Sequence, residues 1–134
     1  MQNWSKKVHV ESSLKPRPNQ WSLFIGRWQP LHDGHKALFD RALTEGKNVW
    51  IAIRDVQITD SNPFDPQEVR RNIESHYSQL ISESRVMVSI IPDICSVEFG
   101  RGVGYDLIEH IPPTEVAEIS ATKIREQMKE NGQL

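Results

Sequence analysis

The sequence predicts an α/β protein built on a doubly wound parallel sheet. Short apolar runs, typical of buried strands, alternate along the chain with segments whose apolar residues recur at helical spacing. The run at residues 48–53 is apolar on both faces, as expected of a strand covered by helices on both sides. This alternating order favours parallel strands joined by crossover helices. A chain of 134 residues corresponds to about one domain, so we expect a single domain.

Each element has its own local signals. The first strand is expected at residues 22–26, the first helix at 34–45, and the second strand at 48–53. Asp65 is a good N-cap for a second helix, with Pro66 at its first position. The inward stripe of that helix comprises Val69, Ile73, Tyr77 and Leu80. A third strand is expected at 85–91, and a last helix follows Ser120, with Ala121, Ile124 and Met128 on its buried side.

Composition excludes several classes of protein. A net charge of −2 argues against a general nucleic-acid-binding protein, which would normally be basic. No apolar run approaches about 18 residues, and the N-terminus lacks an apolar signal core, so neither a membrane span nor secretion is expected. Cys95 is the single cysteine, which excludes an intramolecular disulfide and favours a reducing, cytoplasmic compartment.

Residues 1–20 differ from the rest of the chain. They carry four basic side chains against one acidic, whereas residues 21–134 have a net charge of −5. Pro16 and Pro18 favour an extended path. We therefore expect an N-terminal arm or linker followed by the folded domain at 21–134. A lost upstream fusion partner and a homo-oligomeric state both stay open.

The first strand-to-helix loop, GRWQPLHDGH at residues 26–35, carries many functional groups. Ligands bind doubly wound sheets beyond the carboxyl ends of the strands, and a helix N-terminus there attracts anions. Arg27, His32 and His35 can donate hydrogen bonds to phosphate oxygens. Two alternatives stay open: ordinary capping histidines, or a metal pair that would need further ligands.

Polar groups elsewhere are expected at the same edge of the sheet. In the last helix, Arg125 follows Ser120 by five residues and can reach back toward the first strand-to-helix loop. Ser120 could instead serve only as the N-cap of this helix. Arg54 and Asp55 directly follow the second strand, and Arg101 lies in a glycine-rich loop at 99–105. These three are candidates for binding an acceptor, with Arg101 contacting its phosphate, while the glycines could simply allow a tight loop.

These motifs carry a family resemblance. The stretch GRWQPLHDGH resembles the GRFQPxHxGH signature of the nucleotidylyltransferase superfamily, and ISATKIR at residues 119–125 resembles its second motif, ISSTxIR. Residues 62–64, Asn-Pro-Phe, are similar to a segment of archaeal-type nicotinamide-mononucleotide adenylyltransferases. The resemblance covers residues 21–131 and implies a Rossmann-like nucleotidylyltransferase fold.

The resemblance also implies a reaction and the residues that perform it. A nucleoside monophosphate passes from a nucleoside triphosphate to a phosphomonoester, and pyrophosphate leaves. ATP with nicotinamide mononucleotide is favoured; CTP with a small alcohol phosphate such as glycerol 3-phosphate, or a non-catalytic nucleotide-sensing module, stays open. Mg²⁺ is the implied cofactor, bridging phosphate oxygens. The implied catalytic residues are His32, His35 and Arg125, and the implied nucleotide-binding residues are Gly26, Arg27, Trp28, Gly34, Ser120, Thr122, Lys123 and Ile124.

Two departures from the family pattern concern the acceptor. Related families carry Glu-Arg after Asn-Pro-Phe, whereas here Glu68 is followed by Val69. Residues 93–119 leave room for little more than one short strand and a loop, where many relatives have another helix. The catalytic motifs therefore have more support than the identity of the acceptor.

Overall fold

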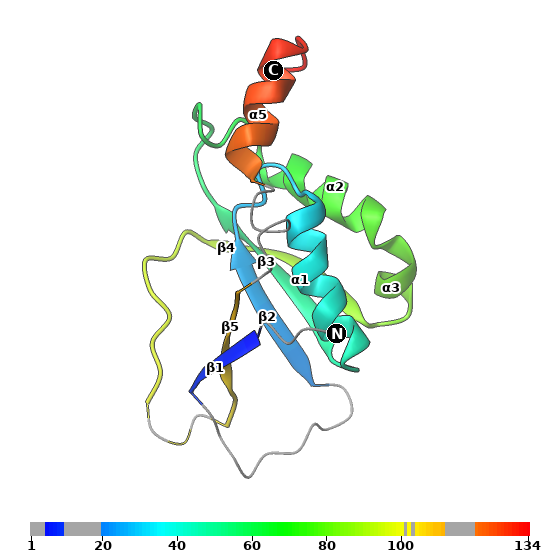
Figure 1. Ribbon diagram of the computed structural model, residues 1–134, viewed down its shortest axis with the longest axis vertical. Helices are drawn as coiled ribbons and strands as arrows, with labels where there is room; N and C mark the ends of the chain where they lie inside the picture. Colours follow the sequence, from blue (N-terminus) through cyan, green and yellow to red (C-terminus); the bar gives the residue numbers. More distant parts are fainter. Residues whose placement is uncertain (1–4, 10–19, 101, 103, 112–119) are drawn as a thin grey trace.

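The computed structural model describes residues 5–9, 20–100, 102, 104–111 and 120–134, with side chains described from residue 20 onward. Its centre is a parallel sheet of three strands, β2 (Trp21–Gly26), β3 (Asn48–Asp55) and β4 (Val86–Pro92), in the order β2-β3-β4 (Figure 1). Phe24, Ile51 and Val88 stand opposite one another across the three strands. The protein is thus an α/β protein with a parallel sheet.

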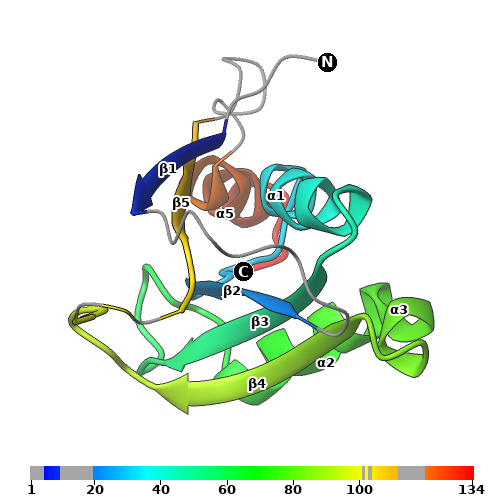
Figure 2. The same cartoon turned by 90° about the horizontal axis from the view of Figure 1, so that it is seen from below.

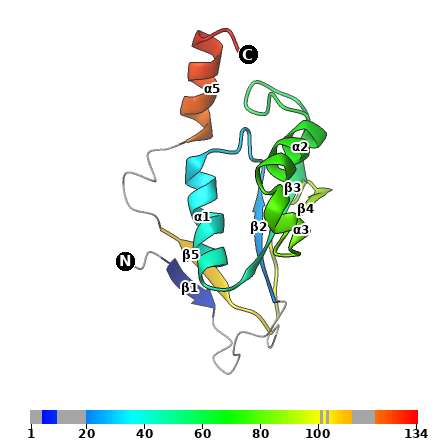
Figure 3. The same cartoon turned by 90° about the vertical axis from the view of Figure 1, so that its right-hand side faces the viewer.

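One face of this sheet carries the hydrophobic core. The helices α1 (Asp33–Thr44) and α2 (Pro66–His76) lie side by side, followed by the short α3 (Ser78–Ser82) (Figure 3). Phe39 of α1 is fully buried, and its ring lies 5.2 Å from that of Phe24 and 6.0 Å from that of Tyr77. Both helices therefore cover the face to which Phe24, Ile51 and Val88 belong.

The expected double winding is wrong for the described residues. On the second face Leu23, Trp50 and Met87 form one row, and Leu23 and Met87 are 48% and 39% exposed. Double winding needs a strand that returns to the free edge of β2, with helices over the second face. The next described strand, β5 (Leu107–His110), instead pairs antiparallel with β1 (Ser5–His9). Figure 2 shows this two-stranded ladder outside the main sheet.

The structure confirms most of the local signals. The Asp65 carboxylate accepts from the Gln67 backbone N–H at 2.8 Å, and Pro66 opens α2. Val69, Ile73 and Tyr77 are buried as expected, but the helix breaks at Tyr77.

The N-terminal stretch and the last helix complete the description. Within residues 1–20 the structure describes β1, which is extended and hydrogen-bonded to β5. The last helix, α5 (Ala121–Glu130), begins at the Ser120 cap, whose Oγ accepts from the Lys123 N–H at 3.2 Å. None of the described helices is long and apolar enough to cross a bilayer.

Candidate active site

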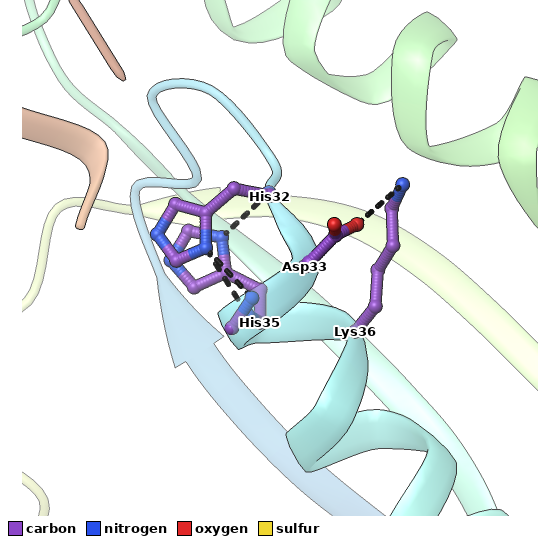
Figure 4. Close-up of polar contacts among 5 residues, drawn as sticks. His32, Asp33, His35 and Lys36 are labelled. Carbon is purple, nitrogen blue, oxygen red and sulfur yellow. Dashed lines mark hydrogen bonds and ion pairs between the residues drawn. The ribbon is translucent and has the colours of Figure 1, made fainter. Parts of the chain in front are cut away.

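Two histidines form the N-terminal cap of α1. His32 is the N-cap residue, and its Nδ1 accepts from the backbone N–H groups of Gly34 at 3.0 Å and His35 at 3.3 Å. In return, the Nδ1 of His35 accepts from the His32 N–H at 3.2 Å (Figure 4). This is a capping box in which imidazoles replace the usual hydroxyl and carboxyl groups. The N–H groups of Gly34 and His35 are thus already bonded and are not free to bind an anion.

The capping box fixes how each imidazole carries its proton. An Nδ1 that accepts a hydrogen bond holds no proton, so the neutral ring carries its proton on Nε2. The two rings are stacked, with centroids 3.6 Å apart and planes 18° apart. Within the described part of the chain, neither Nε2 has a hydrogen-bond partner. The pair therefore carries two Nε2–H donors on nearly parallel rings beside the positive end of α1.

Burial keeps both rings neutral near pH 7. Burial and, to a lesser degree, the neighbouring His32 lower the pKa of His35 to about 3. Burial also lowers the pKa of His32, which is 9% exposed, although Asp33 acts in the opposite direction. A proton added at Nδ1 of either ring would also break the capping box.

These lowered pKa values predict acid-sensitive folding. The unfolded chain takes up protons on its histidines below about pH 6.5, whereas the folded chain resists protonation until much lower pH. Stability is therefore complete above pH 6.5 and falls as the pH falls toward 3, by up to about 1.4 kcal/mol per pH unit for each such group. Urea unfolding at a series of pH values measures this slope.

A matched pair of variants isolates the contribution of His35. His35→Gln keeps an acceptor at this capping-box position but removes the titrating ring, so the slope between pH 6.5 and 4 should decrease. His76→Gln, at an exposed position of α2, is the matched control for the substitution itself. Equal slopes in both variants and the wild type would refute the assignment to His35.

Trp28, an implied nucleotide-binding residue, lies in the core. It is 7% exposed, and its Nε1 donates to the carbonyl of Ala52 at 3.1 Å. Its ring meets those of His35 and Phe39 edge-on, at 4.8 and 5.1 Å. The buried indole therefore packs against the ring of His35 and holds it in place. It also borders a cleft of about 320 Å³, lined in addition by Pro30, Phe64, Glu68, Val69, Asn72 and Met128.

Gly26 is required because the indole of Trp28 lies against it. A Cβ atom on Gly26 would meet Cε2 and Cζ2 of Trp28 at 2.8 Å. Since Trp28 is held on its other sides, we expect Gly26→Ala to lower the free energy of unfolding by about 1–3 kcal/mol. Gly100→Ala is the control, because nothing lies within 4 Å of its added Cβ. Urea unfolding of both variants tests this, and equal stabilities would contradict it.

Arg125 joins α5 to the loop that precedes α1. This side chain is 9% exposed; its Nη1 donates to the carbonyl of Gln29 at 2.6 Å, and its Nη2 donates to Oγ1 of Thr122 at 3.3 Å. The two motifs, nearly a hundred residues apart in sequence, therefore meet in space (Figures 1 and 3). These two bonds use two of the five guanidinium N–H groups. Lys123 is exposed and Ile124 is half-buried on the same turn.

The candidate acceptor residues border a second cleft. It measures about 490 Å³, lies at the carboxyl ends of the strands, and is lined by Arg27, Arg54, Asp55, Val56, Gln57, Thr59, Asn62 and Asp93. Arg54 is paired with the Asp93 carboxylate at 2.8 Å, so its charge is already partly neutralised. Arg27 donates to Oδ1 of Asn62 at 3.2 Å, and Asp55 is exposed. Arg101 lies outside the described residues.

Gln29 is a residue that the sequence analysis did not select. It is 3% exposed, and its side-chain amide makes two reciprocal bonds with the backbone of Phe64: Nε2 donates to the carbonyl at 2.9 Å, and Oε1 accepts from the N–H at 3.0 Å. These partners lie 35 residues away along the chain. No local pattern signals such a contact, so the sequence alone could not reveal it.

The ring nitrogens of the two histidines are only partly available to a ligand. Among the described residues, no group of three or more His, Cys, Asp and Glu side chains converges as a metal site. The Nδ1 atoms of the two histidines accept backbone N–H groups, which leaves only their Nε2 atoms for a ligand. This set fits a triphosphate, and Mg²⁺ bound through that triphosphate's own oxygens fits as well.

Comparisons with known proteins add no family assignment. No protein-family model matches the chain. The search of curated proteins finds no significant match either.

Proposed function

We propose that this chain is a nucleotidylyltransferase with a Rossmann-like fold. It transfers a nucleoside monophosphate from a nucleoside triphosphate, with ATP favoured and CTP as the alternative, to a phosphomonoester such as nicotinamide mononucleotide or glycerol 3-phosphate. The observation that carries the proposal is the stacked histidine pair. Its two Nε2–H donors, held neutral at the start of α1, suit the oxygens of a polyphosphate.

The reaction needs positioning and charge stabilisation more than acid–base chemistry. An oxygen of the acceptor phosphate forms a bond to the α-phosphorus, and the bond from that phosphorus to the bridging oxygen breaks, so that pyrophosphate leaves. The acceptor phosphate has its second pKa near 6 and is largely ionised at pH 7, so it brings its own nucleophilic oxygen. No protein base or nucleophile is required.

Different residues bind the triphosphate and the acceptor. His32 and His35 donate to oxygens of the α- and β-phosphates and stabilise the charge that develops during transfer. The remaining donors of Arg125 hold the β- and γ-phosphates, with Ser120, Thr122 and Lys123 on the same turn. Mg²⁺, when bound, neutralises phosphate oxygens. The cleft beside Arg27, Arg54 and Asp55 receives the acceptor.

A pyrophosphate-release screen tests this function. Four nucleoside triphosphates are each combined with phosphorylated acceptors and with the same compounds lacking phosphate, all with Mg²⁺. We expect release only with phosphorylated acceptors, since a neutral hydroxyl would need a base to remove its proton. Equal rates with a dephosphorylated acceptor would contradict this mechanism. Nucleotide binding without any release would favour a sensing module instead.

A further inference from the structure

Three separate segments of the chain meet at Gln29. Its side chain holds the backbone of Phe64, at the end of the loop that precedes α2. Its carbonyl oxygen accepts from Arg125 of α5. Gln29 itself lies in the loop that leads to the histidine pair. We call the two hydrogen bonds between the Gln29 side-chain amide and the Phe64 backbone the clamp.

The loop at residues 59–64 is a compact unit that the clamp fixes in place. Inside it, the N–H of Thr59 donates to the carbonyl of Asn62 at 3.0 Å, and the N–H of Asn62 donates to the carbonyl of Thr59 at 3.1 Å. At its outer side Arg27 bonds to Asn62 at 3.2 Å, but this contact is exposed. The two part-buried hydrogen bonds to Gln29 are therefore the stronger attachment between this loop and the histidine-bearing loop.

The same loop forms part of the wall of the acceptor cleft. Thr59 and Asn62 line the cleft together with Arg27 and Arg54. Because the clamp is a few residues from both this wall and His32, it sets the distance between an acceptor in the cleft and the phosphates beside the histidines. A shift of about 1 Å in such a distance can cost about 10²-fold in rate.

We propose that Gln29 is a positioning residue that fixes the acceptor side of the site relative to the nucleotide side. This inference rests on the proposed function. Gln29 contacts neither substrate; it acts through the loop at 59–64. The Arg125 contact uses the backbone carbonyl of residue 29, which every substitution retains, so changing the side chain releases the acceptor loop and leaves the arginine in place.

Gln29→Met removes both hydrogen bonds of the clamp at nearly constant side-chain length. We expect the KM for the phosphorylated acceptor to rise about tenfold, the loss associated with one buried hydrogen bond, while the KM for the triphosphate changes less than about twofold. Gln127→Met, at an exposed position of α5, is the matched control and should leave both values unchanged. A purely structural role would lower the unfolding midpoint without separating the two KM values.

Gln29→Glu adds a pH-dependent test. A carboxylate cannot donate to the Phe64 carbonyl, whereas a protonated carboxyl group can donate to it and still accept from the Phe64 N–H. Burial raises the pKa of such a carboxyl group, in documented cases to about 8–9. The acceptor KM relative to wild type should therefore be high at pH 9 and return to within about twofold at pH 6.5. Gln29→Met should show no such recovery.

Hydrogen exchange separates failure of this inference from failure of the proposed function. The Phe64 amide should exchange faster in Gln29→Met than in the wild type, whether or not the chain is an enzyme. Unchanged exchange there, or equal rises in both KM values, would overturn the positioning role. The wild-type chain could neither bind nor turn over nucleotide while the Phe64 amide still exchanges faster in Gln29→Met than in the wild type. This result would overturn the proposed function but would confirm that the clamp holds Phe64.

Discussion

Replacing His32 or His35 by alanine is expected to lower turnover by at least about 10²-fold, the usual cost of losing one preorganised donor to a transition-state oxyanion. Each ring contributes one Nε2–H group, and the centroids of the two rings lie 3.6 Å apart. Steady-state pyrophosphate release at saturating triphosphate measures the loss. The substitution should lower kcat more than it raises KM, because the developing charge is strongest in the transition state.

The same histidines also cap α1, so a fold-preserving variant is needed. His32→Asn retains an acceptor for the N–H groups of Gly34 and His35, since asparagine is among the best N-cap residues. It does not place a donor where Nε2 stood. We expect near wild-type unfolding by urea and the same loss of turnover. A folded His32→Asn protein with normal turnover would show that this ring serves only as a cap.

Arg125→Ala is expected to weaken triphosphate binding by about 10–100-fold, corresponding to the loss of charge-assisted hydrogen bonds. Binding of the nucleoside monophosphate should weaken far less, because the guanidinium is assigned to the β- and γ-phosphates. Arg125→Lys should recover little, since an ammonium group lacks the planar fork that can hold Gln29 and a phosphate together. Titration calorimetry with both nucleotides measures the difference.

The control for Arg125 lies on the same helix. Lys129→Ala removes an exposed positive charge from the last turn of α5 and should leave both affinities unchanged. Because Arg125 also bonds the Gln29 carbonyl, its removal can loosen α5, so urea unfolding is measured in parallel. Equal losses of triphosphate and monophosphate binding would show that Arg125 acts through the fold or through the α-phosphate.

Local sequence signals determined the elements and the start of the site. The Asp65 cap and Pro66 act within a few residues, so the start of α2 could be predicted without the rest of the chain. The positions of His32 and His35 at a helix start follow from the same kind of signal. Their tautomer does not, because it depends on which ring atom each backbone N–H reaches.

Tertiary structure decided the contacts between distant segments. The pairing of Arg54 with Asp93 and the bond from Arg125 to Gln29 span 39 and 96 residues, and many partners are compatible with the sequence at such separations. The surroundings of Trp28 were likewise not predictable from the sequence. Its motif implied contact with a nucleotide, whereas its indole packs against Gly26 and donates a hydrogen bond to the carbonyl of Ala52. Within the part of the chain that the structure describes, β5 pairs with β1 and does not extend the parallel sheet beside β2. This pairing joins strands far apart in the sequence, and the apolar pattern within either strand does not specify so distant a partner.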